Sequence, residues 1–263
     1  MASQDGREGA AGAAGAAGAA ETAAIEASLR RLGTPQRAAS EKAYLKSDLE
    51  FTGTAVPAIR ATVRAWCRAR PELARGELIA VTEALWARPV HECRMAAVEL
   101  LDANVGLLRP GDAALIERML RTARTWALVD GLASNVMGAL TERHPELTAV
   151  LDRWAGDGDF WLRRSAMLAL LVPLRRGEGD FGRFGGYADQ MLEEKEFFIR
   201  KAIGWILRDT AKRRPEMVAA WLEPRAHRAS GVTMREAVKP LPPEVAARLL
   251  AARAGQRGRG QAR

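Results

Sequence analysis

The chain has 263 residues, enough for one large domain or two small ones, and 48% of them are hydrophobic, which is ample material for a buried core. Its formal net charge of +8 favours a polyanionic partner, although a soluble Arg-rich chain without such a partner has the same composition. Two cysteines and three scattered histidines exclude a disulfide framework and a His- or Cys-based metal site, so we expect no metal and no cofactor.

The chain opens with a low-complexity Ala/Gly tract over residues 1–24. This tract lacks the basic start and the Leu-rich stretch of a signal peptide, and no apolar run of about 18 residues predicts a membrane helix. Glycines recurring among the alanines disfavour a helix, so we expect a disordered tail. These observations indicate a cytoplasmic protein without a membrane partner.

From residue 25 to residue 250 apolar residues recur at helical spacing, and no alternating pattern predicts strands. A Gly-rich segment at residues 177–186 predicts a loop, and the Arg/Gly-rich residues 251–263 predict a basic flexible tail. Helix starts are expected near the prolines of the repeating region, which are Pro71, Pro110, Pro145 and Pro215.

A short motif recurs within this helical region: Arg-x-Ala followed by a Leu- or Ile-rich stretch. It begins at Arg94, Arg164 and Arg200, with a weaker copy at Arg235. The spacing of about 35 residues, doubled between the first two copies, is typical of helical solenoids. The doubled interval contains a divergent copy in which Val129 replaces the Arg. Each unit is therefore predicted to be an outer helix that starts near proline and an inner helix that carries the motif, with the inner helices forming one concave wall.

The register of the inner helices separates a buried face from an exposed one. Positions two, three, six and seven after the motif Arg are mostly apolar and predict the buried stripe. The opposite face carries Trp126 and Asp130 in the divergent copy, and Trp205 in a later copy. Two indoles flanking a carboxylate suit a flat, cationic ligand. An equally weighted alternative is that both Trp side chains fill gaps between helices and Asp130 pairs with an Arg.

Basic residues gather in the same region of the chain. Between residues 198 and 214 they greatly outnumber the single acidic residue. We expect Arg164, Lys201 and Arg208 to line the concave wall, where a phosphate backbone can lie. The remaining charges are interpreted as solvated helix faces.

Four stretches of the sequence are similar to a known family. Residues 196–208, Glu-Phe-Phe-Ile-Arg-Lys-Ala-Ile-Gly-Trp-Ile-Leu-Arg, closely resemble the signature of the DNA alkylation repair family, the HEAT-like-repeat alkylpurine DNA glycosylases. Residues 125–130 resemble its Trp-x-x-x-Asp motif and residues 160–164 its Trp-Leu-x-Arg motif. Tyr44 corresponds to its N-terminal tyrosine, ahead of a Gly-x-x-x-Pro-like turn. The resemblance covers about residues 25–245. We therefore expect a HEAT-like-repeat glycosylase domain over residues 25–250.

The resemblance implies an all-α, right-handed α-α superhelix (solenoid) of HEAT-like repeats. It also implies a monofunctional glycosylase of base excision repair. Such an enzyme hydrolyses the N-glycosidic bond of cationic N3- or N7-alkylated purines, 3-methyladenine and 7-methylguanine, in duplex DNA without a base-flipping pocket. The implied residues are Trp126, Asp130 and Trp205 as the active-site trio, Tyr44 near the lesion strand, and Arg164 and Arg208 on the DNA backbone.

The physical chemistry of such a reaction fits these residues. Alkylation places positive charge on the purine and makes it a good leaving group, while the sugar gains oxocarbenium character in the transition state. The Asp130 carboxylate can stabilise that cation and orient or deprotonate a water. We expect a monomer in the cytoplasm, associated with the nucleoid. Two alternatives stay open: a non-catalytic repeat protein that binds damaged or branched DNA, and a protein–protein scaffold.

Overall fold

The computed structural model describes the backbone of residues 5–260 and the side chains of residues 18–254. The described backbone is all-α, with one isolated parallel bridge between Glu50 and Val90 and no strand. None of the described helices is both long and apolar enough to cross a membrane. The chain divides into two compact units, Met1–Leu132 and Ala133–Arg263, so the boundary falls inside the repeat domain that the sequence predicts.

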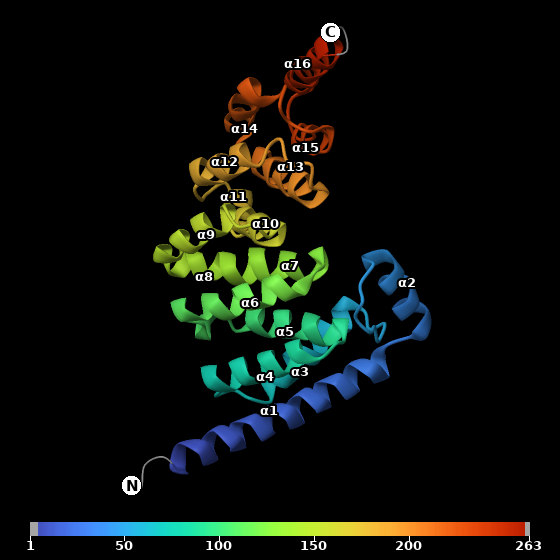
Figure 1. Ribbon diagram of the computed structural model, residues 1–263, viewed down its shortest axis with the longest axis vertical. Helices are drawn as coiled ribbons and strands as arrows, with labels where there is room; N and C mark the ends of the chain where they lie inside the picture. The colour runs from blue at the N-terminus through green and yellow to red at the C-terminus, as the bar shows by residue number, and fades with distance from the viewer. Residues whose placement is uncertain (1–4, 261–263) are drawn as a thin grey trace. The chain divides into compact units, whose positions relative to one another are not determined.

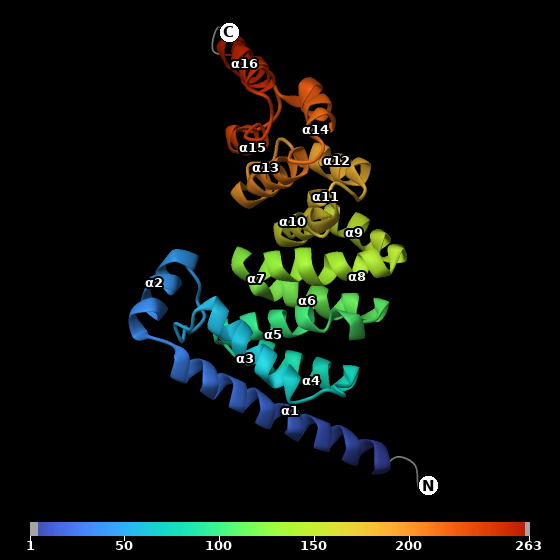
Figure 2. The same cartoon turned by 180° about the vertical axis from the view of Figure 1, so that it is seen from behind.

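The first unit consists of helices joined by short turns (Figures 1 and 2). Its helices are α1 (Asp5–Leu32), α2 (Pro35–Leu45), α3 (Val56–Arg68), α4 (Arg75–Ala87), α5 (His91–Ala103), α6 (Ala113–Ala123) and α7 (Trp126–Gly131), with the 3-10 turns η1 (Val105–Leu107) and η2 (Pro110–Asp112). Helix α1 runs alongside α3 and α4, and α7 packs on α5 and α6. On α3 the buried residues Ile59, Val63 and Trp66 recur at helical spacing, which gives the helix one apolar face.

The expectation of a disordered tail over residues 1–24 differs from the structure, in which residues 5–24 form the first part of α1. Residues 1–4 lie outside the described part of the chain. Thr22 and Ile25 are buried, and the Trp66 indole Nε1 donates to Glu21 Oε2 at 2.8 Å. Alanine has the highest helix propensity, and α1 also packs on α3 and α4, which stabilises the helix as a whole.

The second unit is also built of helices and short turns (Figures 1 and 2). A π-helical segment, η3 (Leu132–Met137), contains the boundary between the units. It is followed by α8 (Gly138–Arg143), η4 (Pro145–Leu147), α9 (Thr148–Ala155), α10 (Phe160–Leu168), α11 (Leu171–Arg175), α12 (Phe181–Gln190), α13 (Phe197–Ala211), α14 (Pro215–Leu222), η5 (Glu223–Arg225), α15 (Gly231–Ala237) and α16 (Pro243–Gly260).

Helices α13 and α15 pack closely because α13 has a glycine at their contact. A Cβ atom added to Gly204 would lie 2.9 Å from the Glu236 Cβ and 3.0 Å from the Thr233 carbonyl oxygen, too near for either. The Gly of the Ala-Ile-Gly-Trp stretch therefore fixes the approach of α15 to α13, beside Trp205.

The expected helix starts are confirmed to different degrees. Pro215 begins α14 directly, whereas Pro110 and Pro145 begin 3-10 turns that lead into α6 and α9. Pro71 lies in a turn ahead of α4.

Two segments expected to be irregular are partly helical. The loop predicted at residues 177–186 is shorter than expected, because the Asp180 side chain accepts a hydrogen bond from the Arg183 N–H at 2.8 Å and caps α12 from Phe181 onward. In the basic tail predicted at residues 251–263, α16 continues to Gly260, and residues 261–263 lie outside the described part.

The Arg side chains of the repeated motif connect neighbouring segments of the fold. Arg94 Nη1 donates to the Thr122 carbonyl oxygen at 3.0 Å, and Arg200 Nε donates to the Glu194 carbonyl oxygen at 2.6 Å. In each case the guanidinium satisfies a backbone carbonyl outside its own helix. The recurrence of Arg in the sequence thus reports how the helices are held together.

Candidate functional site

Two aromatic side chains expected at the site meet in the first unit. Tyr44, near the end of α2, is 74% exposed, and Trp126, the first residue of α7, is half-buried. Their ring centroids lie 6.2 Å apart with the planes at 90°, an edge-to-face contact. The structure therefore brings together two residues that are 82 positions apart in the sequence (126 − 44).

Asp130 lies one helical turn after Trp126 on α7, so the two side chains share a face. The opposite face carries Leu128 and Val129, which are fully buried. A Cβ atom on Gly131 would lie 2.9 Å from Val98 Cγ1, so this glycine lets α7 approach α5 closely. Leu128 and Val129 therefore anchor α7 in the core, whereas Trp126 and Asp130 are only half-buried.

The π-helical segment η3 follows immediately after α7. π-helical turns inside α-helices are uncommon and frequently occur at functional sites. No pattern in the sequence pointed to this segment. It marks the stretch just after Asp130 as a place where the regular helix is interrupted.

A pocket of about 160 Å³ lies beside the aromatic pair. Its lining includes Tyr44, Trp126, Met95, His91 and Glu92. The His91 ring is buried and stacks on Phe51 with centroids 4.6 Å apart, and burial lowers the pKa of His91 below its ordinary value. The pocket is therefore largely apolar, with a neutral imidazole at physiological pH.

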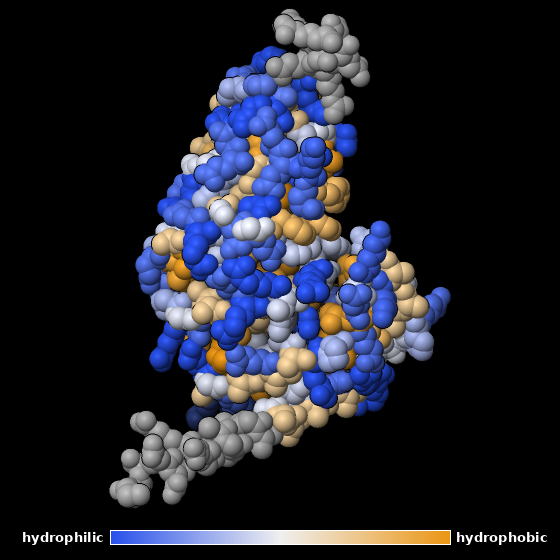
Figure 3. Space-filling model, viewed as in Figure 1, coloured by the Kyte–Doolittle hydropathy of each residue, from blue (hydrophilic) through white to orange (hydrophobic). Residues whose placement is uncertain are grey.

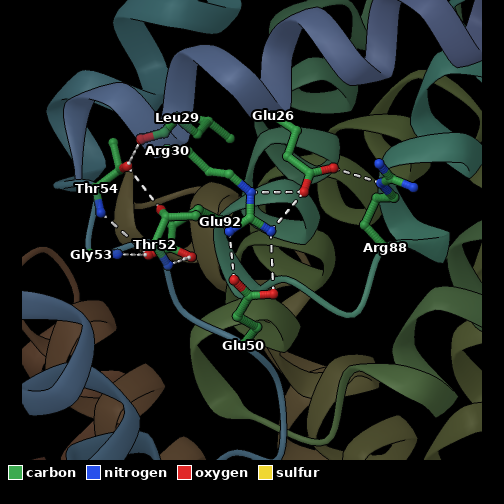
Figure 4. Close-up of polar contacts among 9 residues, drawn as sticks. All are labelled: Glu26, Leu29, Arg30, Glu50, Thr52, Gly53, Thr54, Arg88 and Glu92. Carbon is green, nitrogen blue, oxygen red and sulfur yellow. Dashed lines mark hydrogen bonds and ion pairs between the residues drawn. The ribbon is translucent and has the colours of Figure 1, made fainter. Parts of the chain in front are cut away.

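The loop that precedes α3 is held by hydrogen bonds to the Glu92 side chain (Figure 4). The Glu92 carboxylate is fully buried and accepts hydrogen bonds from the backbone N–H groups of Thr52 (2.9 Å), Gly53 (2.6 Å) and Thr54 (3.3 Å). Gly53 has a φ of 76°, and a Cβ atom there would collide with the Thr34 carbonyl oxygen at the beginning of α2. Glu92 thus fixes the one backbone conformation that lets α2 begin where it does.

Helix α2 has little other attachment. None of its residues is buried, although the Thr34 hydroxyl caps it by accepting a hydrogen bond from the Arg37 N–H at 3.4 Å. By contrast, α1 is tied down by an ion-pair network in which Arg30 bridges Glu26 and Glu50, and Glu26 also binds Arg88 at 2.6 Å (Figure 4). Tyr44 therefore lies on a helix held at its start and at its contact with Trp126.

In the second unit, the structure contradicts the exposed position expected for Arg164. This side chain is only 2% exposed, and its Nη1 donates to the Phe198 carbonyl oxygen at 2.5 Å. Its guanidinium carbon also lies 6.0 Å from the centre of the Phe198 ring. The register argument failed here because the motif Arg reaches across to the first turn of α13 to satisfy a carbonyl.

Trp205 and Arg208 of α13 both contact Asp209, the single acidic residue between residues 198 and 214. Trp205 Nε1 donates to Asp209 Oδ2 at 3.0 Å, and Arg208 Nε lies 3.4 Å from Asp209 Oδ1. Lys212 and Arg175 also bind this carboxylate, at 3.0 Å and 2.9 Å. Burial raises the pKa of Asp209, but the hydrogen bonds from Lys212 and Arg175 outweigh it and lower that pKa. The Trp205 ring is therefore oriented by a buried anion.

A second acidic residue, Glu236 of α15, was missed altogether. It pairs with Lys201 at 3.5 Å, with Arg208 at shorter range, and with Lys239 at 2.9 Å. The hydrogen bond from Lys239 and the charges of Lys201 and Arg208 lower the pKa of Glu236 despite partial burial. Its position, one residue after Arg235 in the weak repeat copy, corresponds to that of Lys201 in the preceding copy, which is the signal that could have revealed it.

The model of the DNA alkylation repair enzyme family matches residues 25–241. The chain belongs to the DNA alkylation repair enzyme family. As a member of this family, the protein has a role in DNA repair, and its partner is DNA. No match is found among curated proteins. The stretch matched contains every residue that the sequence proposed for the site.

Solved structures with similar folds include members of this family. A protein described as a predicted DNA alkylation repair enzyme from Enterococcus faecalis is 24% identical, with a TM-score of 0.71 over 79% of this chain and 95% of that one. AlkD2 from Streptococcus mutans is 15% identical, with a TM-score of 0.57 over 78% of this chain and 98% of that one. The protein smu.31 from Streptococcus mutans UA159 is 15% identical, with a TM-score of 0.55 over 68% and 91%. These likenesses confirm the all-α helical-repeat fold.

One face of the protein is drawn in Figure 3. On the face drawn in Figure 3, hydrophilic residues cover most of the area and apolar residues form only small separate areas. Within the described residues, no group of three or more His, Cys, Asp and Glu side chains is placed to hold a metal ion. The candidate side chains described in the two units are carboxylates, indole and phenol rings, and cations.

Proposed function

We propose that the protein is a monofunctional DNA glycosylase. It hydrolyses the N-glycosidic bond of cationic N3- or N7-alkylated purines in duplex DNA, as a monomer in the cytoplasm and without a cofactor. The observation that carries this proposal is the aromatic pair on α2 and α7, Tyr44 against Trp126, with Asp130 on the same face as Trp126. In a family of DNA alkylation repair enzymes, that arrangement suits a nucleotide carrying positive charge.

Asp130 supplies the electrostatic part of the reaction. An alkylated purine is already a cation and leaves without needing a strong acid, so the barrier lies in the developing charge on the deoxyribose. A fixed carboxylate next to that sugar stabilises the cation and orients a water for attack at C1′. Trp126 contributes an apolar wall that keeps bulk water from screening the carboxylate.

The proposed enzyme reads the sugar and backbone at the lesion while the base stays in the duplex, as the family resemblance implies.

The residues of the second unit are proposed to bind the DNA backbone. Trp205 presents an indole whose N–H is fixed by Asp209, and Lys201 and Arg208 offer cations that Glu236 partly neutralises. Arg164, being buried, is assigned a positioning role: it fixes the start of α13, which carries these three residues.

The test is release of 7-methylguanine from methylated duplex DNA by the Asp130→Asn variant. Removing the carboxylate charge is expected to slow release by about 100-fold or more, while the affinity for DNA changes by less than about threefold because Asn occupies the same space. The control Glu72→Gln removes one exposed charge far from the site in sequence and keeps the wild-type rate.

Three outcomes would refute the proposal in different ways. Wild-type release by Asp130→Asn would exclude its assigned role. Tight DNA binding by the wild-type protein without any base release would favour the non-catalytic DNA-binding alternative. Absence of DNA binding would favour a protein–protein scaffold.

A further inference from the structure

A second pocket of the first unit, about 330 Å³ in volume, has cationic walls that the proposed reaction does not use. Three of its lining residues are the bases Lys46, Arg94 and Arg124, and one is an acid, Asp48. The other lining residues are Ser47, Leu49, Thr122 and Ala123. The formal charge around this pocket, which we call the basic pocket, is therefore +2 (three bases minus one acid).

The cations of the basic pocket are not neutralised by carboxylates. Among the described side chains, neither Lys46 nor Arg124 forms an ion pair, whereas Arg118 on the adjoining helix α6 pairs with Glu83 at 2.9 Å. Arg94 donates only to carbonyl oxygens, including that of Thr122 at 3.0 Å, and faces the Trp86 ring. Burial, and then the nearby charge of Arg124, lower the pKa of Arg94. The Arg94 and Arg124 guanidinium groups thus lie close enough to repel each other, and within the described part of the chain no ion pair joins either of them to a carboxylate.

The backbone at this pocket is unusual as well. Lys46 and Arg124 have φ values of 49° and 50°, and they are the only non-glycine residues with positive φ in the described chain. Both follow the last turn of a helix, α2 and α6 respectively, where glycine is the favoured residue because it has no Cβ to strain. A long cationic side chain at each of these two positions is therefore unfavourable for folding. Strained positions of this kind cluster at ligand-binding sites.

The basic pocket adjoins the aromatic pair along the chain. Lys46 follows Tyr44 by two residues, and Arg124 precedes Trp126 by two. These cations are therefore within reach of a strand that contacts the two rings. We infer that the basic pocket binds a backbone phosphate of the DNA strand that contacts Tyr44 and Trp126, with Lys46 and Arg124 as its ligands and Arg94 as a fixed background charge. This inference rests on the proposed function for the placement of DNA beside the rings.

The test uses the full-length variants Lys46→Gly and Arg124→Gly. Glycine removes the charge and also relieves the positive φ, so the melting temperature is expected to be unchanged or higher. Binding of a labelled, undamaged duplex is measured by anisotropy over a series of salt concentrations. Each variant is expected to lose affinity about fivefold or more at low salt and to reduce the slope of log K against log salt by about 0.9, the value of one phosphate contact. Arg118→Ala, the matched control on α6, keeps the wild-type slope.

A single methylphosphonate linkage, which is neutral, locates the phosphate. Moved one position at a time along the strand, it is expected to weaken wild-type binding at one position and to have no further effect there on Arg124→Gly. A wild-type slope in both glycine variants would overturn the inference. A second result would also overturn it. If inorganic phosphate raises the melting temperature of the wild type but not of Arg124→Gly, while Arg124→Gly keeps the wild-type salt slope on DNA, the pocket binds a free anion and not a backbone phosphate.

The two proposals fail separately in these experiments. If Arg124→Gly loses the phosphate contact but the wild type releases no base, the proposed glycosylase activity is wrong and the basic pocket stands. If the wild type releases base and the glycine variants bind DNA as the wild type does, the basic pocket is wrong and the activity stands.

Discussion

Glu92→Gln tests whether one buried carboxylate holds the loop that begins α2. Glu92 Oε1 accepts from the N–H groups of Gly53 and Thr54, and Oε2 accepts from that of Thr52. Glutamine keeps one acceptor oxygen but turns an NH₂ group toward the third N–H. One charged hydrogen bond is lost, worth about 1.5–3 kcal/mol, and the other two become neutral and weaken by about 1 kcal/mol each.

The unfolding free energy of Glu92→Gln is therefore expected to fall by about 4 kcal/mol. For a chain of this size the melting temperature then drops by about 8–16 °C. Urea unfolding followed by circular dichroism measures the first quantity, and a thermal scan the second.

Glu99→Gln is the matched control. Glu99 lies on the same helix, α5, and pairs with Arg60 at 2.9 Å, but the Arg60 side chain is 50% exposed. An ion pair of this kind contributes less than about 1 kcal/mol. Equal losses in the two variants would refute the reasoning, because the three backbone contacts of Glu92 would then contribute nothing beyond an ordinary surface pair.

Three further predictions follow from charged and buried groups. Glu236→Gln frees Lys201 and Arg208 from their shared anion, so it is expected to tighten binding to undamaged duplex about 3- to 10-fold at low salt, and unchanged affinity would show that these cations do not touch DNA. Because burial lowers the pKa of His91 below 6.5, only the unfolded chain takes up this proton just below that pH. The unfolding free energy of the wild type should therefore fall relative to that of His91→Phe as the pH drops from 6.5, by at most about 1.4 kcal/mol per pH unit; parallel pH profiles would contradict this. Burial raises the pKa of the Cys93 thiol to about 12, so mass spectrometry after brief alkylation at neutral pH should find it unmodified in the native protein and modified once urea unfolds the chain.

Much of the fold followed from spacing in the sequence. Apolar periodicity and the recurring Arg motif predicted an all-α chain of helix pairs, and Ile203 and Ile206, three and six residues after Arg200, are buried as the predicted register required. The Ala/Gly tract was misjudged, because the contribution of packing to α1 depends on Trp66 and other residues far along the chain. Local propensity contains no information about such distant partners.

The candidate site was predictable in its residue types and less so in its contacts. The contact of Tyr44 with Trp126 was not predicted, since nothing local relates the two residues and the family resemblance placed Tyr44 only near the lesion strand. Arg164 was placed on the wrong side because a periodic pattern gives the direction of a Cβ and not the reach of a long side chain. Glu236 was missed because its partners lie on another helix.

Helix α2 contributes no buried residue to the first unit, yet it carries Tyr44. Mutations of its exposed residues are therefore expected to change the free energy of unfolding little. Mutations in α7 are expected to change it more, because Leu128 and Val129 are part of the core. Evolution can vary this helix without endangering the rest of the domain. Sequence changes are therefore expected to accumulate in α2 before they accumulate in α7.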